Sequence, residues 1–412
     1  MAKSASAEYD IIIAGGGMIG TSLALALRPL NLKVAVVEAI ARGAEQQPSF
    51  DDRSTALSRS TQRMFEAMGL WPEIAAASTP IKSIHISDKG RFGFSHINAE
   101  EQQVEALGYV VINRLLGQVL QQALADASNI EMICPAEITA ADPGDKSVTV
   151  TIAAEGEDRH LTARLLVAAD GANSAVRDMV GISAQRVDYE QWAVIGNLLP
   201  DMAPANRAFE RFTEDGPIAM LPIAGDRSAF VWMNSPEVAS EILDLDDAAF
   251  TARLQDAFGY RIGRFSRIGK RAAYPLALTK ANGLIARRSV VVGNAAHGLH
   301  PVAAQGFNLG LRDVAALCDC IADSQSTGEI DPGNASVLES YAEWRKSDQD
   351  KVLRFTDGLV HLFADSRPAV RALRNAAMIG FDLIPGVRRM FAKHTMGLAG
   401  RLPRLSRGVP LE

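Results

Sequence analysis

Three glycines near the N-terminus have the spacing of a phosphate-binding loop. Gly15, Gly17 and Gly20 form a G-x-G-x-x-G pattern. In such a pattern the first glycine allows a tight turn, the second lets the backbone approach a pyrophosphate, and the third lets a helix pack closely on a strand. Unpaired N–H groups and a partial positive charge at the helix N-terminus attract the phosphates. The spacing therefore predicts a dinucleotide site here.

The flanking residues supply the rest of a βαβ unit. The run Ile11–Ile13 is β-branched throughout, which is typical of a strand buried on both faces. An apolar helix is expected over 21–30 and a second strand over 34–37. That strand leads into Glu38, which stands where an acid accepts hydrogen bonds from a ribose. These features leave both FAD and NAD open as the dinucleotide.

A second motif, Asp170-Gly171, follows an apolar run at 165–169. One interpretation is an ordinary strand–turn–helix junction in which Asp170 or Ser174 caps the helix. The other is a second loop against the same dinucleotide, with Arg177 near the phosphate charge. The residues alone leave both interpretations open.

The third motif begins with a buried strand predicted at 290–292, followed by a glycine-rich turn at 293–297 and the segment 300–308. A helix is expected over 309–320. Its N-terminus can face an anionic or electron-rich group, because helix N-termini carry partial positive charge.

In this order and at about these separations, the three motifs resemble those of the class A flavoprotein monooxygenases, the group that includes 4-hydroxybenzoate hydroxylase. The resemblance covers most of the chain and implies FAD as the cofactor. It also implies a role for each matching residue. Gly15, Gly17, Gly20 and Glu38 would hold the ADP half, Asp170 and Gly171 would lie near the pyrophosphate and admit the nicotinamide cofactor, Asn294 would contact the ribityl chain, and Gly306, Phe307 and Asn308 would edge the isoalloxazine ring. This chain departs from the family by having Asn294 in place of Asp and Ala304 in place of Gly.

Five further segments resemble one branch of that group, the ubiquinone-biosynthesis hydroxylases. They are 52–58, 113–116, 216–222, 295–313 and 396–403. The branch implies a polyprenylated phenol as substrate, with NADPH or NADH and O₂ as co-substrates. By the same resemblance Arg53 and Arg114 would lie along the phosphates or the ribityl chain of FAD. Surface salt bridges are the alternative role for both arginines.

The expected fold is α/β: a Rossmann-like FAD-binding domain of the 4-hydroxybenzoate hydroxylase type, with an inserted β-sheet substrate domain and a helical C-terminal region. At 412 residues the chain is long enough for two or three packed units. We expect the FAD-binding domain over 1–78, 108–182 and 276–322, the substrate domain over 79–107 and 183–275, and a helical basic region over 335–412.

Within these domains two sets of side chains are candidates for the reacting centre. His297 and His300 are candidates for a general base that deprotonates the phenol, or for a structural pair that orients the loop; Pro301 beside them is a further candidate. Phe212, Pro217 and Trp232 are candidates for contacts with the substrate ring, although an ordinary sheet core explains them as well. We expect no metal, since the three cysteines have no metal-binding spacing.

The net charge and the distribution of apolar and basic residues indicate which kinds of partner to expect. The net charge of −6 argues against nucleic acid, which requires a positive surface. No apolar run reaches the roughly 18 residues of a membrane span and the N-terminus lacks an apolar targeting core, so a cytoplasmic protein is expected. Basic and apolar residues alternate near the C-terminus, which predicts either a solvated helical face or a peripheral contact with the inner face of the cell membrane. The basic residues are Arg388, Arg389, Lys393, Arg401, Arg404 and Arg407.

Three other functions remain as alternatives. One is an FAD-dependent reductase or dehydrogenase of a prenyl lipid, which uses the same scaffold without inserting oxygen. The second is a non-catalytic flavoprotein subunit of a quinone-biosynthesis protein complex. A plain NAD dehydrogenase is the third.

Overall fold

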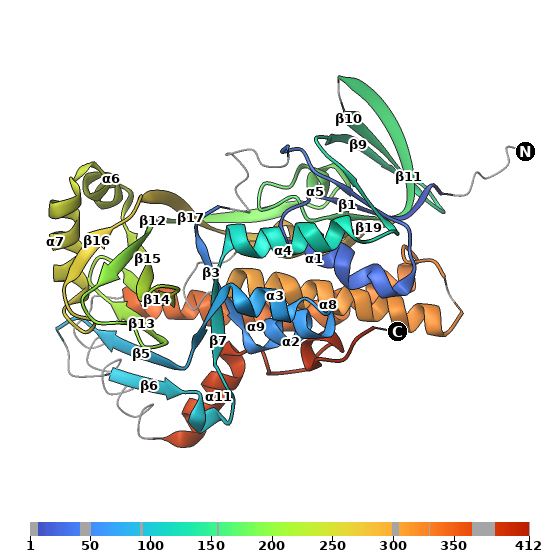
Figure 1. The fold of residues 1–412 in the computed structure, drawn as a ribbon. Helices are drawn as coiled ribbons and strands as arrows, with labels where there is room; N and C mark the ends of the chain where they lie inside the picture. The colour runs from blue at the N-terminus through green and yellow to red at the C-terminus, as the bar shows by residue number, and fades with distance from the viewer. Residues whose placement is uncertain are drawn as a thin grey trace, which may run out of the picture.

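A computed structural model describes residues 7–41, 51–90, 94–154, 156–298, 305–328, 330–364 and 384–411. Its chain forms two large sheets and one small one, with the long helices α8 and α9 side by side below the first sheet in Figure 1. The predicted α/β class, with an FAD-type domain, a second β-sheet unit and a helical C-terminal region, is confirmed.

The first sheet has a parallel centre in the order β19-β11-β1-β2-β8. Ile11, Ile12 and Ile13 are fully buried, as expected for a strand covered on both faces. One face packs on helices and the other on the antiparallel strands β9 and β10. The strands are β1 (Tyr9–Ala14), β2 (Val34–Val37), β8 (Ile130–Ile133), β9 (Glu137–Pro143), β10 (Val148–Ala154), β11 (Glu157–Ala168), β18 (Ile285–Ala286) and β19 (Ser289–Val291).

The helices of this unit depart a little from their expected limits. Helix α1 spans Met18–Leu27, so it begins directly after its N-cap Gly17, and the chain then continues as a 3₁₀ turn containing Pro29. Helix α8 spans Gln305–Ser326 and is longer at both ends than the predicted 309–320. The others are α2 (Arg59–Ala67), α3 (Trp71–Ala76), α4 (Asn113–Ala125), α5 (Ala175–Met179) and α9 (Ala335–Ala364).

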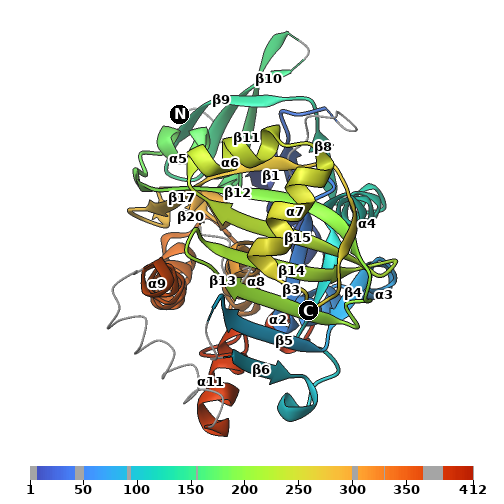
Figure 2. The ribbon, with the colours of Figure 1, turned by 90° about the vertical axis from the view of Figure 1, so that its left-hand side faces the viewer.

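The second sheet is ordered β20-β17-β12-β15-β14-β13-β5-β6, with β16 paired to β12. Helices α6 and α7 cover the face that is turned towards the viewer in Figure 2. The elements are β5 (Ser83–Asp88), β6 (Phe94–Asn98), β12 (Ala184–Pro200), β13 (Arg207–Phe212), β14 (Pro217–Ile223), β15 (Arg227–Asn234), β16 (Phe265–Ile268), β17 (Ala272–Ala281), β20 (His297–Gly298), α6 (Pro236–Asp244) and α7 (Asp247–Phe258).

A small sheet, β3-β7-β4, joins the two units. Its strands are β3 (Ser54–Ser58), β4 (Ser78–Ile81) and β7 (Gly108–Ile112). The face of the second sheet that α6 and α7 leave uncovered packs against it, through Ala208 and Ala229 on Ile81 and Val110. We call this the inner face, because it is turned towards the dinucleotide-binding unit. Helix α11 (Pro385–Thr395) packs beside it, against Ile97 and neighbouring residues of the β5–β6 edge.

Alternation along β13 separates the two faces of the second sheet. Phe209 lies in the cluster beneath α6 and α7, and Arg211 Nε donates to the carbonyl of Ala257 in α7. Successive side chains of a strand point to opposite faces. Glu210 therefore shares the inner face with Ala208 and Phe212.

The glycine that closes the first turn provides a test of this packing. A Cβ added at Gly20 would lie 1.9 Å from the carbonyl oxygen of Gly15, which is backbone and cannot rotate away. We expect Gly20→Ala to lower the free energy of unfolding by at least about 1–3 kcal/mol and to reduce flavin retention, as measured by thermal unfolding and bound FAD. Gly358→Ala is the matched control, because a Cβ there meets nothing within 4 Å. Equal behaviour of the two variants would contradict the expected clash.

Candidate functional site

The N-terminus of α1 is built to receive a phosphate group. Its N-cap Gly17 makes no side-chain capping bond, so the first N–H groups of the helix are left for another acceptor. Gly15 has a φ of +100°, and a Cβ there would lie 2.7 Å from the carbonyl oxygen of Ala169. Glu38 Oε2 accepts a hydrogen bond of 2.6 Å from the N–H of Gly16, and Oε1 accepts one of 2.8 Å from Ile40. The carboxylate is thus fixed beside the loop and keeps lone pairs for a ribose hydroxyl.

The Asp170-Gly171 loop forms a capped junction. Asp170 accepts hydrogen bonds from the Ser174 hydroxyl and from the N–H of Val176, and Ser174 accepts one from the N–H of Arg177. These bonds agree with the capping interpretation. They leave lone pairs on Asp170 and do not test a role beside the cofactor.

Arg177 connects this loop with the third motif instead of lying free. Its Nη1 donates to the carbonyls of Ala172 (3.1 Å) and Ala295 (3.2 Å), and its Nε pairs with Asp178 at 3.1 Å. The side chain is only 7% exposed. The sequence interpretation that placed Arg177 near phosphate charge missed this bridging role, because Ala295 is distant in the chain.

The third motif is a 3₁₀ turn, η3 (Gly293–Ala295), in which Asn294 is exposed while its two neighbours are buried. The N–H of Gly293 donates a 3.0 Å hydrogen bond to Asp313 Oδ2. The exposed amide of Asn294 therefore offers both a hydrogen-bond donor and an acceptor, and the bond from Gly293 to Asp313 anchors the turn that carries it.

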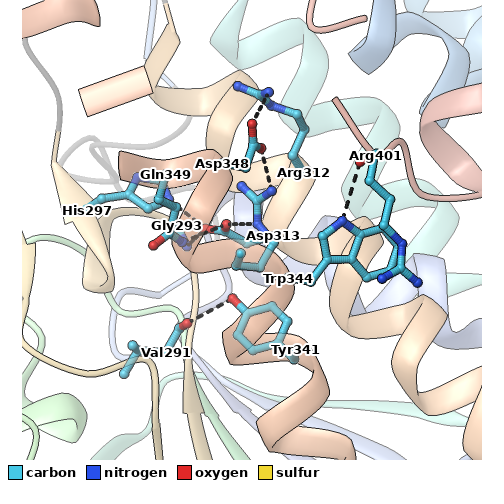
Figure 3. Close-up of polar contacts among 11 residues, drawn as sticks. Val291, Gly293, His297, Arg312, Asp313, Tyr341, Trp344, Asp348, Gln349 and Arg401 are labelled. Carbon is cyan, nitrogen blue, oxygen red and sulfur yellow. Dashed lines mark hydrogen bonds and ion pairs between the residues drawn. The ribbon is translucent and has the colours of Figure 1, made fainter. Parts of the chain in front are cut away.

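The anchor is a buried carboxylate. Asp313 of α8 is completely buried, and four groups converge on it (Figure 3): the N–H of Gly293, His297 Nε2 at 2.6 Å, Arg345 Nε at 2.7 Å and Gln349 Nε2 at 2.9 Å. Burial by itself would raise the pKa of Asp313, but His297 and Arg345 outweigh it and hold that pKa well below its usual range. This carboxylate joins the η3 turn to α8 and α9.

A second carboxylate balances the charge of this buried group. Asp348 pairs with Arg345 Nη1 at 2.5 Å and with Arg312 Nη1 at 3.1 Å. Burial lowers the pKa of Arg312, and it opposes the rise in the pKa of Arg345 that Asp313 and Asp348 produce. Two guanidinium groups thus face two carboxylates, which is the arrangement that buried charges require.

His297 belongs to this network. Its side chain is 1% exposed and its Nε2 is engaged with Asp313. Among the described residues no group bonds its Nδ1. The contact favours the loop-orienting interpretation, and the general-base role stays a prediction. His300 and Pro301, like Ala304, lie outside the described residues.

Asn308 holds the start of α8 against the corner between β3 and α2. Its Oδ1 accepts from the Ser58 N–H (2.8 Å) and the Thr61 hydroxyl (2.7 Å), and its Nδ2 donates to the carbonyl of Ala56 at 2.9 Å. The amide is occupied within the protein, so contact with a ring at this position would use the backbone. Gly306 and Phe307, two residues and one residue before it, are both half-buried.

The two predicted arginines both make ion pairs at the site's edge. Arg53 Nε lies 2.5 Å from Asp51, and its guanidinium stacks 4.8 Å over the ring of Tyr274. Arg114 Nε lies 3.1 Å from Asp52, with a side chain 51% exposed. These pairs are the salt bridges of the alternative interpretation, and a contact with FAD stays a prediction for both.

The three predicted ring contacts divide between the faces of the second sheet. Phe212 and Pro217 are paired across β13 and β14 on the inner face. Trp232 is 2% exposed, and its ring centroid lies 6.0 Å from that of Phe250 in the cluster beneath α6 and α7. Its position favours the core interpretation. Glu210 is not among the predicted residues; its signal in the sequence is the charged pair Glu210-Arg211 between the apolar residues Phe209 and Phe212.

No metal cluster of three or more His, Cys, Asp or Glu side chains occurs in the described part of the chain. The same residues include no helix long and apolar enough to cross a membrane.

The uncapped α1 N-terminus, the fixed acid at the end of β2 and the exposed amide on η3 have the chemistry to fit the phosphates, ribose and ribityl chain of FAD. A family model described as FAD binding domain matches residues 8–356. The chain belongs to this family, and the expected cofactor and its class as an FAD-dependent aromatic monooxygenase are confirmed.

Relatives and solved structures agree with this assignment. The chain is 35% identical to ubiquinone hydroxylase UbiL of Rhodospirillum rubrum, with 99% of this chain and 95% of the relative covered. It is 30% identical to 3-demethoxyubiquinol 3-hydroxylase of Escherichia coli, with coverages of 94% and 98%. The crystal structure of p-nitrophenol 4-monooxygenase PnpA from Pseudomonas putida is similar in fold, with a TM-score of 0.78, 19% identity and coverages of 95% and 98%.

The buried carboxylate can be tested by removing its charge. We expect Asp313→Asn to lower the free energy of unfolding by about 3–5 kcal/mol, because Arg345 is left buried with fewer counter-charges, and to weaken FAD retention through the η3 turn. Glu343→Gln, at an exposed position of α9, is the control. Chemical denaturation and flavin release measure the two effects.

The same substitution has a pH signature. Because the folded pKa of Asp313 is depressed, its contribution to stability is present above the ordinary carboxylate pKa of about 4 and is lost as pH falls through the lower folded value. The difference in stability between wild type and Asp313→Asn should thus be constant from pH 7 to about 5 and shrink in stronger acid. A difference that grows as pH falls would contradict the assignment.

Proposed function

We propose that this protein hydroxylates the aromatic ring of a polyprenylated phenol in ubiquinone biosynthesis, with NADPH or NADH and O₂ as co-substrates. One observation supports this above all: relatives named as ubiquinone hydroxylases match nearly the whole chain, including the second sheet. The overall change inserts one atom of O₂ into the ring, and NAD(P)H supplies the electrons that reduce the other atom to water.

Bound FAD supplies the redox and oxygen-transfer chemistry. The chain's own residues bind and position the reactants. We propose that Gly15, Gly17, Gly20 and Glu38 hold the ADP half, that Asp170, Gly171, Arg53 and Arg114 lie along the phosphates, that Asn294 holds the ribityl chain, and that Gly306, Phe307 and Asn308 edge the ring system. The inner face of the second sheet carries apolar side chains such as Ile195, Val231 and Met233. We propose that this apolar side of the sheet faces the polyprenylated substrate and excludes water.

The proposed activity is tested with purified FAD holoenzyme, a short-chain 2-prenylphenol and NAD(P)H under ¹⁸O₂. We expect substrate-stimulated NAD(P)H oxidation and one ¹⁸O atom in the product, detected by mass spectrometry. A reductase would turn over without O₂, and a non-catalytic subunit would show neither reaction. A deletion strain should accumulate a polyprenyl phenol that lacks ring oxygen, and restoration of the gene should clear it.

We also propose a peripheral contact with an anionic membrane surface through α11. Ile384, Val387 and Met390 are spaced by three residues and are 53%, 36% and 68% exposed. The exposed basic residues Arg389 and Lys393 flank them. Apolar side chains with adjoining positive charge are typical of helices that lie in a membrane interface, where a polyprenyl substrate resides.

Met390→Asp tests this surface. We expect binding to vesicles that contain phosphatidylglycerol to fall about tenfold, because one apolar side chain no longer inserts and the added carboxylate has the same negative charge as the lipid headgroup. Met202→Asp is the matched control, because Met202 is 58% exposed in the second sheet unit. Co-sedimentation measures the bound fraction; equal losses in both variants would argue against α11.

A further inference from the structure

Glu210 of β13 is a carboxylate on the inner face of the second sheet. Glu210 is paired across the sheet with Ala219 of β14 and with Ile86 of β5. Its strand neighbours Phe209 and Arg211 point the other way, into the layer of α6 and α7. The register therefore fixes Glu210 on the side turned towards the dinucleotide-binding unit.

The surroundings of this carboxylate are apolar. Its Oε1 is completely buried, and no described residue hydrogen-bonds it. Asp88, two residues beyond Ile86 in β5, is a second carboxylate on the same face of the sheet. Burial raises the pKa of Glu210 to about 7. The residue as a whole is half-buried. A carboxylate oxygen that is buried without a partner is costly, and positions that keep one are often functional.

Glu210 shares its sheet face with residues that pack towards the start of α8. Ala208, two residues before it, belongs to the cluster against which Ala56 packs, and the carbonyl of Ala56 accepts the Asn308 amide. Asn308 begins the segment of α8 that we propose to edge the flavin. Beyond Glu210 the inner face continues into Val231 and Met233, outside the cluster that packs on the small sheet. Glu210 thus lies between the cluster that packs on the small sheet and a second apolar cluster around Met233.

We propose that Glu210 binds the hydroxyl of the phenol substrate and accepts its proton. This inference rests on the proposed function. The phenol O–H bond breaks, its electron pair stays on the oxygen as phenolate, and the proton forms a bond to a carboxylate oxygen of Glu210. The added electron density on the ring favours transfer of an electrophilic oxygen atom. The carboxylate form is required, so the effect increases as pH rises through about 7.

Two small probes test binding independently of hydroxylation. 2-Methoxyphenol carries the hydroxyl, and 1,2-dimethoxybenzene replaces it with a methyl ether. Titration of the FAD holoenzyme, followed by flavin absorbance, should show at least about tenfold tighter binding of the phenol at pH 8 and a smaller preference at pH 6. Glu210→Leu should abolish the preference, and Glu210→Gln should remove its dependence on pH.

Asp215→Asn is the matched control, because it removes an exposed charge from the β13–β14 turn. FAD content and thermal unfolding establish that each variant is folded. A preference for the phenol that survives with its pH dependence in either Glu210 variant overturns the proposal.

Turnover separates this inference from the proposed function. If the holoenzyme hydroxylates a 2-prenylphenol, Glu210→Gln should lower kcat about 100-fold, with a small change in KM and a flat pH profile near 7. Unchanged turnover in Glu210→Gln overturns the proton-acceptor role. If the wild type hydroxylates no phenol but keeps a Glu210-dependent preference for 2-methoxyphenol, the proposed function fails and the binding role of Glu210 stands.

Discussion

The site depends on the buried carboxylate of Asp313. A turn that is proposed to hold part of a cofactor must present its groups in one fixed position, yet η3 is a short segment at the end of a strand. Asp313 fixes this turn from beneath by holding the N–H of Gly293 and the ring of His297, while Arg345 and Gln349 tie the same carboxylate to α9. Because the four contacts share one completely buried anion, loss of its charge would loosen the turn and both helices together.

The second constraint is the two-residue alternation of the second sheet. It assigns Phe209 and Trp232 to the core beneath α6 and α7, and Glu210, Phe212 and Pro217 to the inner face. The apolar cluster beneath α6 and α7 stabilises the sheet, and no predicted catalytic residue lies in it. The inner face packs on the small sheet at Ala208, and its other apolar side chains include a second cluster around Met233. A shift of register by one residue would exchange these roles.

Local patterns were enough to predict much of the fold. The βαβ unit, its glycine positions and the strand before η3 follow from β-branched runs and fixed glycine spacings, which act over a few residues. Helix ends were less predictable: α8 begins four residues before the predicted start. Phe212 and Trp232 are both large aromatic residues of expected strands, and only the register of the paired strands decided that they point to opposite sides of one sheet.

The sequence alone determined the dinucleotide-binding unit, because its motif is carried by residues close together in the chain, and the FAD class followed from the resemblance that the three motifs carry together. Only the tertiary structure decided what the polar side chains do. Arg177 bridges to Ala295, Asn308 binds the β3–α2 corner, and Asp313 gathers groups from α9, all across large sequence separations. Burial likewise comes from packing: the same acid is ordinary on a surface, and the apolar surroundings of Glu210 are what raise its pKa to about 7.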